Sequence, residues 1–121
     1  MFEFEVTLPE KVSMNKIYAG MHWRKRQELA DLYHGEMLAL KGKIKVTEYP
    51  VKIHYDYHFT GTPLDSLNTA LISKMIEDGM VHAGVLEKDD PKYVKRSILD
   101  SQKSKKYKHD TVVVRIEKFA P

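Results

Sequence analysis

Strict alternation between apolar and polar residues predicts two strands that each bury one face. Residues 2–8 alternate phenylalanine, valine and leucine with glutamate and threonine. In residues 51–59 the alternation is clearest, and its apolar side consists of Val51, Ile53, Tyr55, Tyr57 and Phe59. Two further runs, at about 93–100 and 111–119, predict a second pair of strands, joined by the lysine-rich segment 101–110.

Between these strands, apolar residues at helical spacing predict two helices. The first covers about 21–40 and ends before Gly42, with lysines near the end where the helix dipole favours cations. Its apolar stripe consists of Leu29, Leu32, Tyr33, Met37 and Leu40. The second covers about 66–82, with Asp65 or Ser66 as N-cap. Its apolar positions nearly encircle it and predict a central helix: Leu67, Leu71, Ile72, Met75, Ile76, Met80 and Val81.

The element order β-α-β-α-β-β predicts an α+β fold in a single domain, residues 1–121, with a mixed or antiparallel sheet packed with two helices. A chain of 121 residues can build one core without staples. It has no cysteine, which excludes disulfides and thiolate metal sites. No apolar run approaches the roughly 20 residues of a membrane span, and the first residues do not resemble a signal peptide. We therefore expect a cytoplasmic protein with no membrane contact.

Positive charge is concentrated in three clusters, although the net charge of the chain is only +3. The clusters are Arg24, Lys25 and Arg26; Lys41, Lys43 and Lys45; and Lys103, Lys105, Lys106 and Lys108. They are either separate solvated faces or one surface that the fold assembles to contact phosphate. A second candidate for phosphate binding is the start of the first helix, because helix N-termini with nearby cations suit phosphate. The polar and aromatic residues in its first turn and in the irregular segment before it are Ser13, Asn15, Tyr18, His22, Trp23 and Arg24.

Two acidic turns flank the second helix, because Asp65 precedes it and Asp89 and Asp90 follow it. Mg²⁺ binds a few carboxylate oxygens and keeps most of its waters. A helix of about 16 residues is roughly 24 Å long, so a joint site requires the following segment to fold back along the helix. Alternatively, Asp65 caps the helix and the other two aspartates form a turn. An acidic pocket within a basic surface predicts a metal-dependent nuclease.

Two further groups of polar residues are candidates for the same chemistry. Lys74 and Asp78 lie four residues apart on the second helix. They either form an ion pair or place Lys74 beside a scissile phosphate, where it would stabilise developing charge. On the polar side of the strand 51–59, His54, Asp56 and His58 stand about 6.6 Å apart, which is wide for a single ion. We expect them to face solvent or to cover the sheet, and we keep His58 as a supporting residue because it is nearest the acidic turn.

The order of these motifs resembles the RusA-like Holliday junction resolvases of phages and prophages. The similar segments are Pro9…Ser13-Met14-Asn15-Lys16-Ile17-Tyr18, Val51-Lys52-Ile53…His58, Lys74…Asp78 and Leu86…Asp89-Asp90…Val94. The resemblance implies an endonuclease that cleaves four-way DNA junctions in recombination and repair. It also implies a homodimer and Mg²⁺ as cofactor, with Mn²⁺ as a substitute. The dimer contact would come from the N-terminal strand or from the last strand, residues 112–116.

The resemblance also implies roles for particular residues. Asp65, Asp89 and Asp90 would hold the metal and, with Lys74, form the catalytic site. The implied DNA contacts are Asn15, Lys16, Tyr18, Arg24, Lys25, Arg26, Lys105 and Lys106. The supporting residues are His58, Asn68 and Asp78.

One carboxylate of the family motif D-x-D-N-x-x-K has no counterpart. In one alignment Asp65-Ser66-Leu67-Asn68 matches D-x-D-N, and Leu67 replaces a carboxylate. In the other, Asp65 matches the second aspartate, and Pro63 replaces the first. The alternative to a nuclease is therefore a protein of the same fold that binds structured DNA without cutting it. A third alternative is a protein-interaction domain that keeps only the fold.

Overall fold

The computed structural model describes residues 1–9 and 23–120. The elements follow one another as β1 (Phe2–Thr7), α2 (Trp23–Leu38), β2 (Val51–Phe59), α3 (Ala70–His82), β3 (Val94–Lys103) and β4 (Thr111–Lys118). A short 3₁₀ helix, Ser66–Thr69, leads directly into α3. This order and the α+β class confirm the predictions from the sequence.

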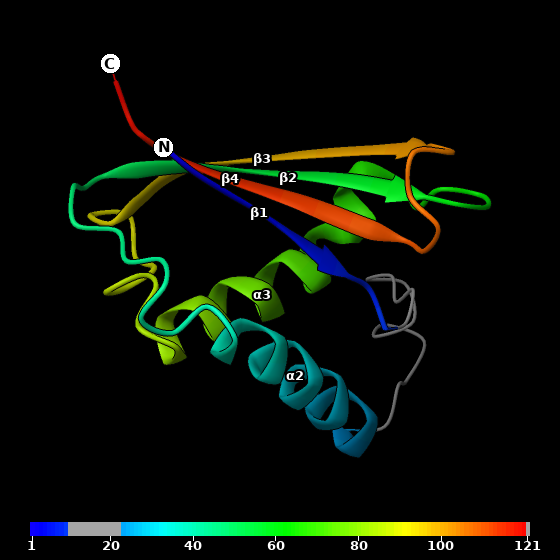
Figure 1. Ribbon diagram of the computed structural model, residues 1–121, viewed down its shortest axis with the longest axis horizontal. Coiled ribbons are helices and arrows are strands. Elements are labelled where there is room, and N and C mark those ends of the chain that lie inside the picture. Colours follow the sequence, from blue (N-terminus) through cyan, green and yellow to red (C-terminus); the bar gives the residue numbers. More distant parts are fainter. Residues whose placement is uncertain (10–22, 121) are drawn as a thin grey trace.

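The strands form one mixed sheet in the order β1-β4-β2-β3. β4 is antiparallel to both β1 and β2, while β2 and β3 are parallel and are connected through α3. Both helices cover the same face of the sheet (Figure 1). The opposite face, called the open face below, carries the polar residues of β2. None of the helices within the described ranges is long and apolar enough to cross a bilayer.

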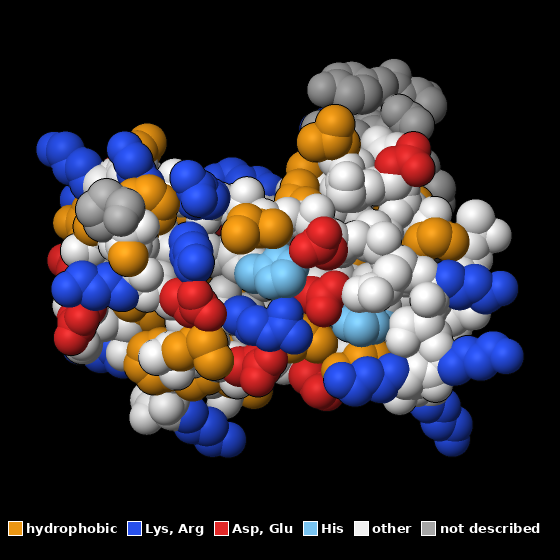
Figure 2. Space-filling model, turned by 90° about the horizontal axis from the view of Figure 1, so that it is seen from above, with side chains coloured by type: hydrophobic (Ala, Val, Ile, Leu, Met, Phe, Trp, Pro, Cys, Tyr) orange, Lys and Arg blue, Asp and Glu red, His pale blue; other side chains and the backbone are white. Residues whose placement is uncertain are grey.

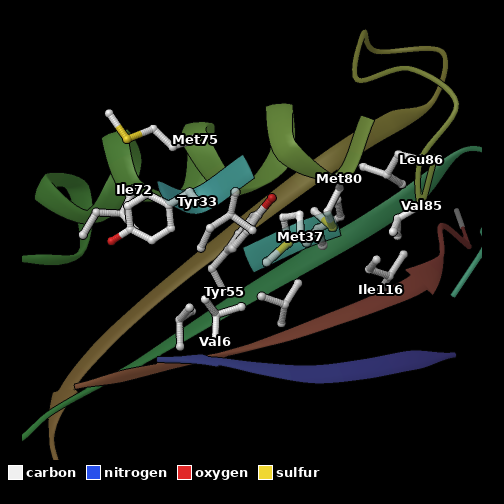
Figure 3. Packing of buried hydrophobic residues seen from close by; sticks show 14 of the residues in the cluster. Val6, Tyr33, Met37, Tyr55, Ile72, Met75, Met80, Val85, Leu86 and Ile116 are labelled. Atoms are coloured by element: carbon white, nitrogen blue, oxygen red, sulfur yellow. The ribbon is translucent and has the colours of Figure 1, made fainter. Parts of the chain in front are cut away.

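The core fills the space between the sheet and the two helices, as the alternation in β2 predicts. All five apolar residues of β2 are buried, and its polar residues are half-buried on the open face. The helices contribute Leu29 and Ile76 to the same core. They also contribute Tyr33, Met37, Ile72 and Met80, which are labelled in Figure 3. α2 and α3 approach closely at Gly79, where an added Cβ would lie 2.8 Å from the Cγ of Met37.

Two leucines assigned to the core face solvent. Leu67 is 78% exposed because the first turn of the second predicted helix is a 3₁₀ helix, in which side chains repeat every three residues. Leu32 is 52% exposed because α2 covers the sheet with a single stripe, Leu29, Tyr33 and Met37. Asp65 is the N-cap of the 3₁₀ helix, as predicted, but its side chain makes no capping hydrogen bond.

The position of β4 corrects one expectation about dimerisation. β4 lies between β1 and β2, so both of its edges are already paired within the sheet. Val112, Val114 and Ile116 are buried in the core. The last strand therefore has no apolar face to offer a second copy. The edges of the sheet are β1 and β3.

The segment after α3 turns back along the helix. Gly84 takes a positive φ of 80°, which a residue with a side chain rarely adopts. The backbone N–H groups of Val85 and Leu86 then both donate to the carbonyl of Met80, at 2.9 and 3.2 Å. Both side chains are buried, which anchors the turn. This is the fold-back that a joint site of the two acidic turns requires, and it carries Asp89 toward the middle of α3.

Candidate functional site

Lys74 lies between two carboxylates that come from different segments. Its Nζ is 3.0 Å from Oδ1 of Asp78, one helical turn further along α3. It is also 3.0 Å from Oδ2 of Asp89, which the fold-back brings alongside the helix. The ion-pair alternative for Lys74 and Asp78 is therefore confirmed, and Asp89 joins the pair. These three residues are called the Lys74 cluster below.

The charges of the Lys74 cluster stabilise one another. Hydrogen bonds to Asp78 and then to Asp89 raise the pKa of Lys74 above its usual value. The hydrogen bond from Lys74 lowers the pKa of Asp89. The ammonium and this carboxylate are thus both charged at neutral pH. All three side chains remain substantially open to water, so the cluster is a surface interaction and its ion pairs are individually weak.

Glu77, beside the Lys74 cluster, is the acidic residue with the least usual environment. Its Oε1 accepts a hydrogen bond of 2.9 Å from the hydroxyl of Tyr55. Burial raises the pKa of Glu77, and the hydrogen bond from Tyr55 offsets part of that rise. A carboxyl group with a raised pKa is a candidate proton donor or acceptor.

A second tyrosine of β2, Tyr57, also has its hydroxyl group in contact with α3. Tyr57 and Ser73 are 2.6 Å apart, hydroxyl to hydroxyl. The alternation along residues 51–59 assigned Tyr55 and Tyr57 only to the core. The signal it missed is that a buried tyrosine hydroxyl needs a partner, and that partner had to come from the helix facing β2.

A shallow hollow of about 170 Å³ opens between α3 and β3 next to these groups. Its walls are formed by Tyr55, Ala70, Ser73, Lys74, Glu77, Ser97 and Leu99. It therefore combines an ammonium, a carboxyl group and hydroxyl groups with an apolar wall. Such a combination can bind a small polar group and exchange a proton with it.

The three predicted metal ligands do not converge. Asp65 is exposed at the start of the 3₁₀ helix, and Asp89 is paired with Lys74. Oδ1 of Asp90 accepts a hydrogen bond of 2.9 Å from the backbone N–H of Lys92, as in an ordinary aspartate turn. Within residues 1–9 and 23–120, no three His, Asp or Glu side chains are grouped so that they could hold a metal ion. The described residues thus do not fit the predicted three-carboxylate Mg²⁺ site.

Of the supporting residues, only Asp78 joins the cluster. The backbone N–H of Asn68 donates to the carbonyl of Asp65, a local contact of the 3₁₀ helix. His58 lies on the open face, where its Nε2 is 3.2 Å from Oδ2 of Asp56. The sheet therefore separates His58 from Lys74, which lies on the helix side.

The predicted DNA contacts fall into three groups. Asn15, Lys16 and Tyr18 lie outside the described residues, as do Ser13 and His22. Arg24, Lys25 and Arg26 lie in the first turn of α2. Lys105 and Lys106 are exposed in the loop between β3 and β4, near Lys103 and Lys108.

The lysines at the end of β3 and in this loop differ from Lys52 and Lys118, two other lysines of the sheet. Lys52 pairs with Glu117 at 3.3 Å, and Lys118 pairs with Glu48 at 3.6 Å. In contrast, Lys103, Lys105, Lys106 and Lys108 have no ion pair with any carboxylate of the described residues. On the open face, basic side chains project at both ends, and histidines and carboxylates gather between them (Figure 2).

Two of the three basic clusters do not merge into one surface. Segment 41–45 and the loop 104–110 lie at opposite ends of the sheet (Figure 1). The hypothesis of separate solvated faces is therefore correct for these two clusters. Neither cluster forms an ion pair with a carboxylate of the described residues, and the cluster around the loop has the larger number of lysines, four against three.

Comparison with known proteins adds no family assignment. No protein-family model and no curated protein matches the chain. The resemblance to RusA-like resolvases therefore remains a prediction from the sequence.

Proposed function

We propose that this chain binds branched DNA and that the lysines Lys103, Lys105, Lys106 and Lys108, called the loop lysines below, contact the phosphates. The observation that carries the proposal is that these four lysines lie within residues 103–108 and that none of them forms an ion pair with a carboxylate of the described residues. An ammonium without a neighbouring carboxylate gives up no ion pair when it meets a phosphate. DNA binding by such groups also releases counterions from the nucleic acid, which supplies much of the affinity.

Fluorescence anisotropy with a labelled four-way junction and a linear duplex of the same sequence tests this proposal. We expect binding to both, tighter for the junction, with affinity falling as salt rises. The variant Lys105→Gln/Lys106→Gln should lower the slope of log affinity against log salt by about 1.8, at about 0.9 per lost phosphate contact. Lys118→Gln is the control, because Lys118 already pairs with Glu48.

Two results would refute the DNA-binding proposal. The first is no salt-sensitive affinity for either DNA, which would favour the protein-interaction domain. The second is an unchanged salt slope in the double variant, which would show that the loop lysines do not contact phosphate.

A second candidate function is Mg²⁺-dependent cleavage of the same branched DNA in recombination and repair, in the cytoplasm. The fold-back that brings Asp89 to Lys74 supports it, because it meets one requirement of a joint acidic site, although the three predicted carboxylates do not form a metal-binding group within the described residues. Cleavage of the junction with Mg²⁺ or Mn²⁺, compared with EDTA, is the test. Asp90→Asn keeps the turn hydrogen bond to Lys92 and should abolish cleavage while binding persists. Binding without any cleavage by the wild type would leave DNA binding as the function.

A further inference from the structure

The loop between β3 and β4 is bonded to the sheet at both of its ends (Figure 1). At its start, the backbone N–H of Ser104 donates to the carbonyl of Phe59, at 2.9 Å. At its end, Oδ1 of Asp110 accepts hydrogen bonds from the backbone N–H and the hydroxyl of Thr60, at 2.8 and 3.0 Å. The carbonyl of Asp110 accepts another from the backbone N–H of Leu8, at 2.8 Å. Three of the four loop lysines lie between these two ends.

Tyr107 anchors the middle of the same loop on the open face. Its hydroxyl donates to Oε1 of Glu5 in β1, at 3.2 Å. Its ring packs edge to face with the ring of His58 in β2, with centroids 5.1 Å apart, which is a preferred arrangement of two aromatic rings. Because β4 lies between β1 and β2, a side chain that contacts both crosses β4. Val113 of β4, which is opposite Glu5 in the register, is accordingly only 4% exposed.

The His58 ring on which Tyr107 packs is itself held in place. Its Nε2 is 3.2 Å from Oδ2 of Asp56, and the side-chain amide of Gln102 donates to the other oxygen of Asp56, at 2.6 Å. The second ring nitrogen of His58, Nδ1, is buried and has no hydrogen-bond partner within the described part of the chain. The contact of His58 with Tyr107 is therefore one between ring surfaces and does not use this nitrogen.

We propose that Tyr107 and His58 are positioning residues for DNA binding, because together they hold the loop lysines in the arrangement that meets the phosphates. This inference rests on the proposed function. Lys106 shows the connection most directly, since its Nζ lies 5.4 Å from the centre of the Tyr107 ring, within the range of a cation–π contact. A loop that is already ordered loses less conformational entropy on binding, so the same four charges bind more tightly than they would on an unanchored loop.

Direct stacking of Tyr107 on a base is the alternative way in which it could act on DNA. The contacts within the protein favour the positioning role over stacking. The ring already packs on His58 and Lys106, and the hydroxyl is bonded to Glu5. The two roles differ in one consequence, because only a positioning role requires His58 and Tyr107 to act together.

Limited proteolysis tests the anchor without any DNA, because trypsin cleaves after lysine. Tyr107→Ala removes both contacts of the anchor and should make cleavage at the loop lysines about tenfold faster, since a protease cuts the locally opened form. Mass spectrometry of the fragments identifies the sites. Tyr93→Ala is the matched control. Tyr93 also contacts a ring, that of Tyr49, and a lysine, Lys88, but it lies at the opposite end of β3. Loop cleavage in Tyr107→Ala that is no faster than in wild type would overturn the proposal.

Anisotropy with the four-way junction tests the effect on binding. Tyr107→Ala should weaken binding about tenfold, as expected if only about one tenth of the loops remain in the binding arrangement. Its salt slope should stay close to that of wild type, because all four lysines remain. His58→Ala should also weaken binding, and His58→Phe should recover most of that loss because it keeps a ring beneath Tyr107. The double variant Tyr107→Ala/His58→Ala should bind no more weakly than Tyr107→Ala, since both changes remove the same contact.

Two binding results would overturn the inference while leaving the proposed function intact. One is wild-type binding that Tyr107→Ala leaves unchanged. The other is an additive loss in the double variant, which would show that Tyr107 acts on the DNA independently of His58. Failure of the proposed function gives a different result, because the wild type would then show no salt-sensitive affinity, and the positioning role would be overturned with it. Circular dichroism checks the fold of every variant.

Discussion

The closest approach of α2 and α3 gives a quantitative test of the core. At Gly79 of α3, an added Cβ would lie 2.8 Å from Cγ of Met37 and 3.3 Å from the Cα of His34. The methionine side chain can move, but the backbone of α2 cannot do so without shifting the helix. Gly79→Ala should therefore strain the packing between the helices.

The expected magnitude is the difference between two effects. Replacing glycine by alanine inside a helix stabilises by about 1 kcal/mol through helix propensity. Forcing a methyl group into a close-packed contact costs about 1–3 kcal/mol. We expect Gly79→Ala to lower the free energy of unfolding by about 1 kcal/mol, because the nearest flexible atom can absorb part of the clash.

Gly35 provides a matched control on the opposing helix. It lies inside α2, and an added Cβ would meet nothing within 4 Å. Gly35→Ala should therefore raise the free energy of unfolding by about 0.5–1 kcal/mol through helix propensity alone. Urea unfolding followed by circular dichroism measures both, and thermal midpoints should move in opposite directions by about 4 °C per kcal/mol. Equal stabilisation by the two substitutions would refute the close packing of α2 against α3 at Gly79.

Two further predictions concern the charged groups of the candidate site. Lys74→Met should reduce stability at neutral pH by only about 0.2–1 kcal/mol, because its ion pairs are exposed. Pairing with Lys74 lowers the pKa of Asp89. The stabilisation of the folded state by this ion pair is therefore fully present above the unfolded-state pKa of Asp89, and it is lost as the pH falls through the folded-state pKa. Urea titrations of wild type and variant should therefore converge in acid, and a gap that widens in acid would contradict this. Burial raises the pKa of Glu77, so the stabilisation from its protonated form is lost as pH rises. Glu77→Gln keeps an acceptor for Tyr55 and should make the unfolding free energy less dependent on pH than in wild type at pH values above the usual pKa of a glutamate, whereas an unchanged pH dependence would contradict it.

Local patterns in the sequence determined the elements and the class of this protein. The alternation in β2 identified its buried residues because side chains on a strand alternate between two faces. The ion pair of Lys74 with Asp78 also followed from spacing, since residues four apart on a helix are neighbours. Both results depend only on residues close together in the chain.

Only the tertiary structure decided which distant residues meet. The turn at Gly84 brings Asp89 into an ion pair with Lys74. Asp65 does not join them in a metal-binding group of the described residues. The tertiary structure also placed β4 inside the sheet and β3 at its edge, which no local pattern distinguishes. The physical reason is that strand order and the packing of loops depend on contacts between segments far apart in sequence, which periodicity does not encode.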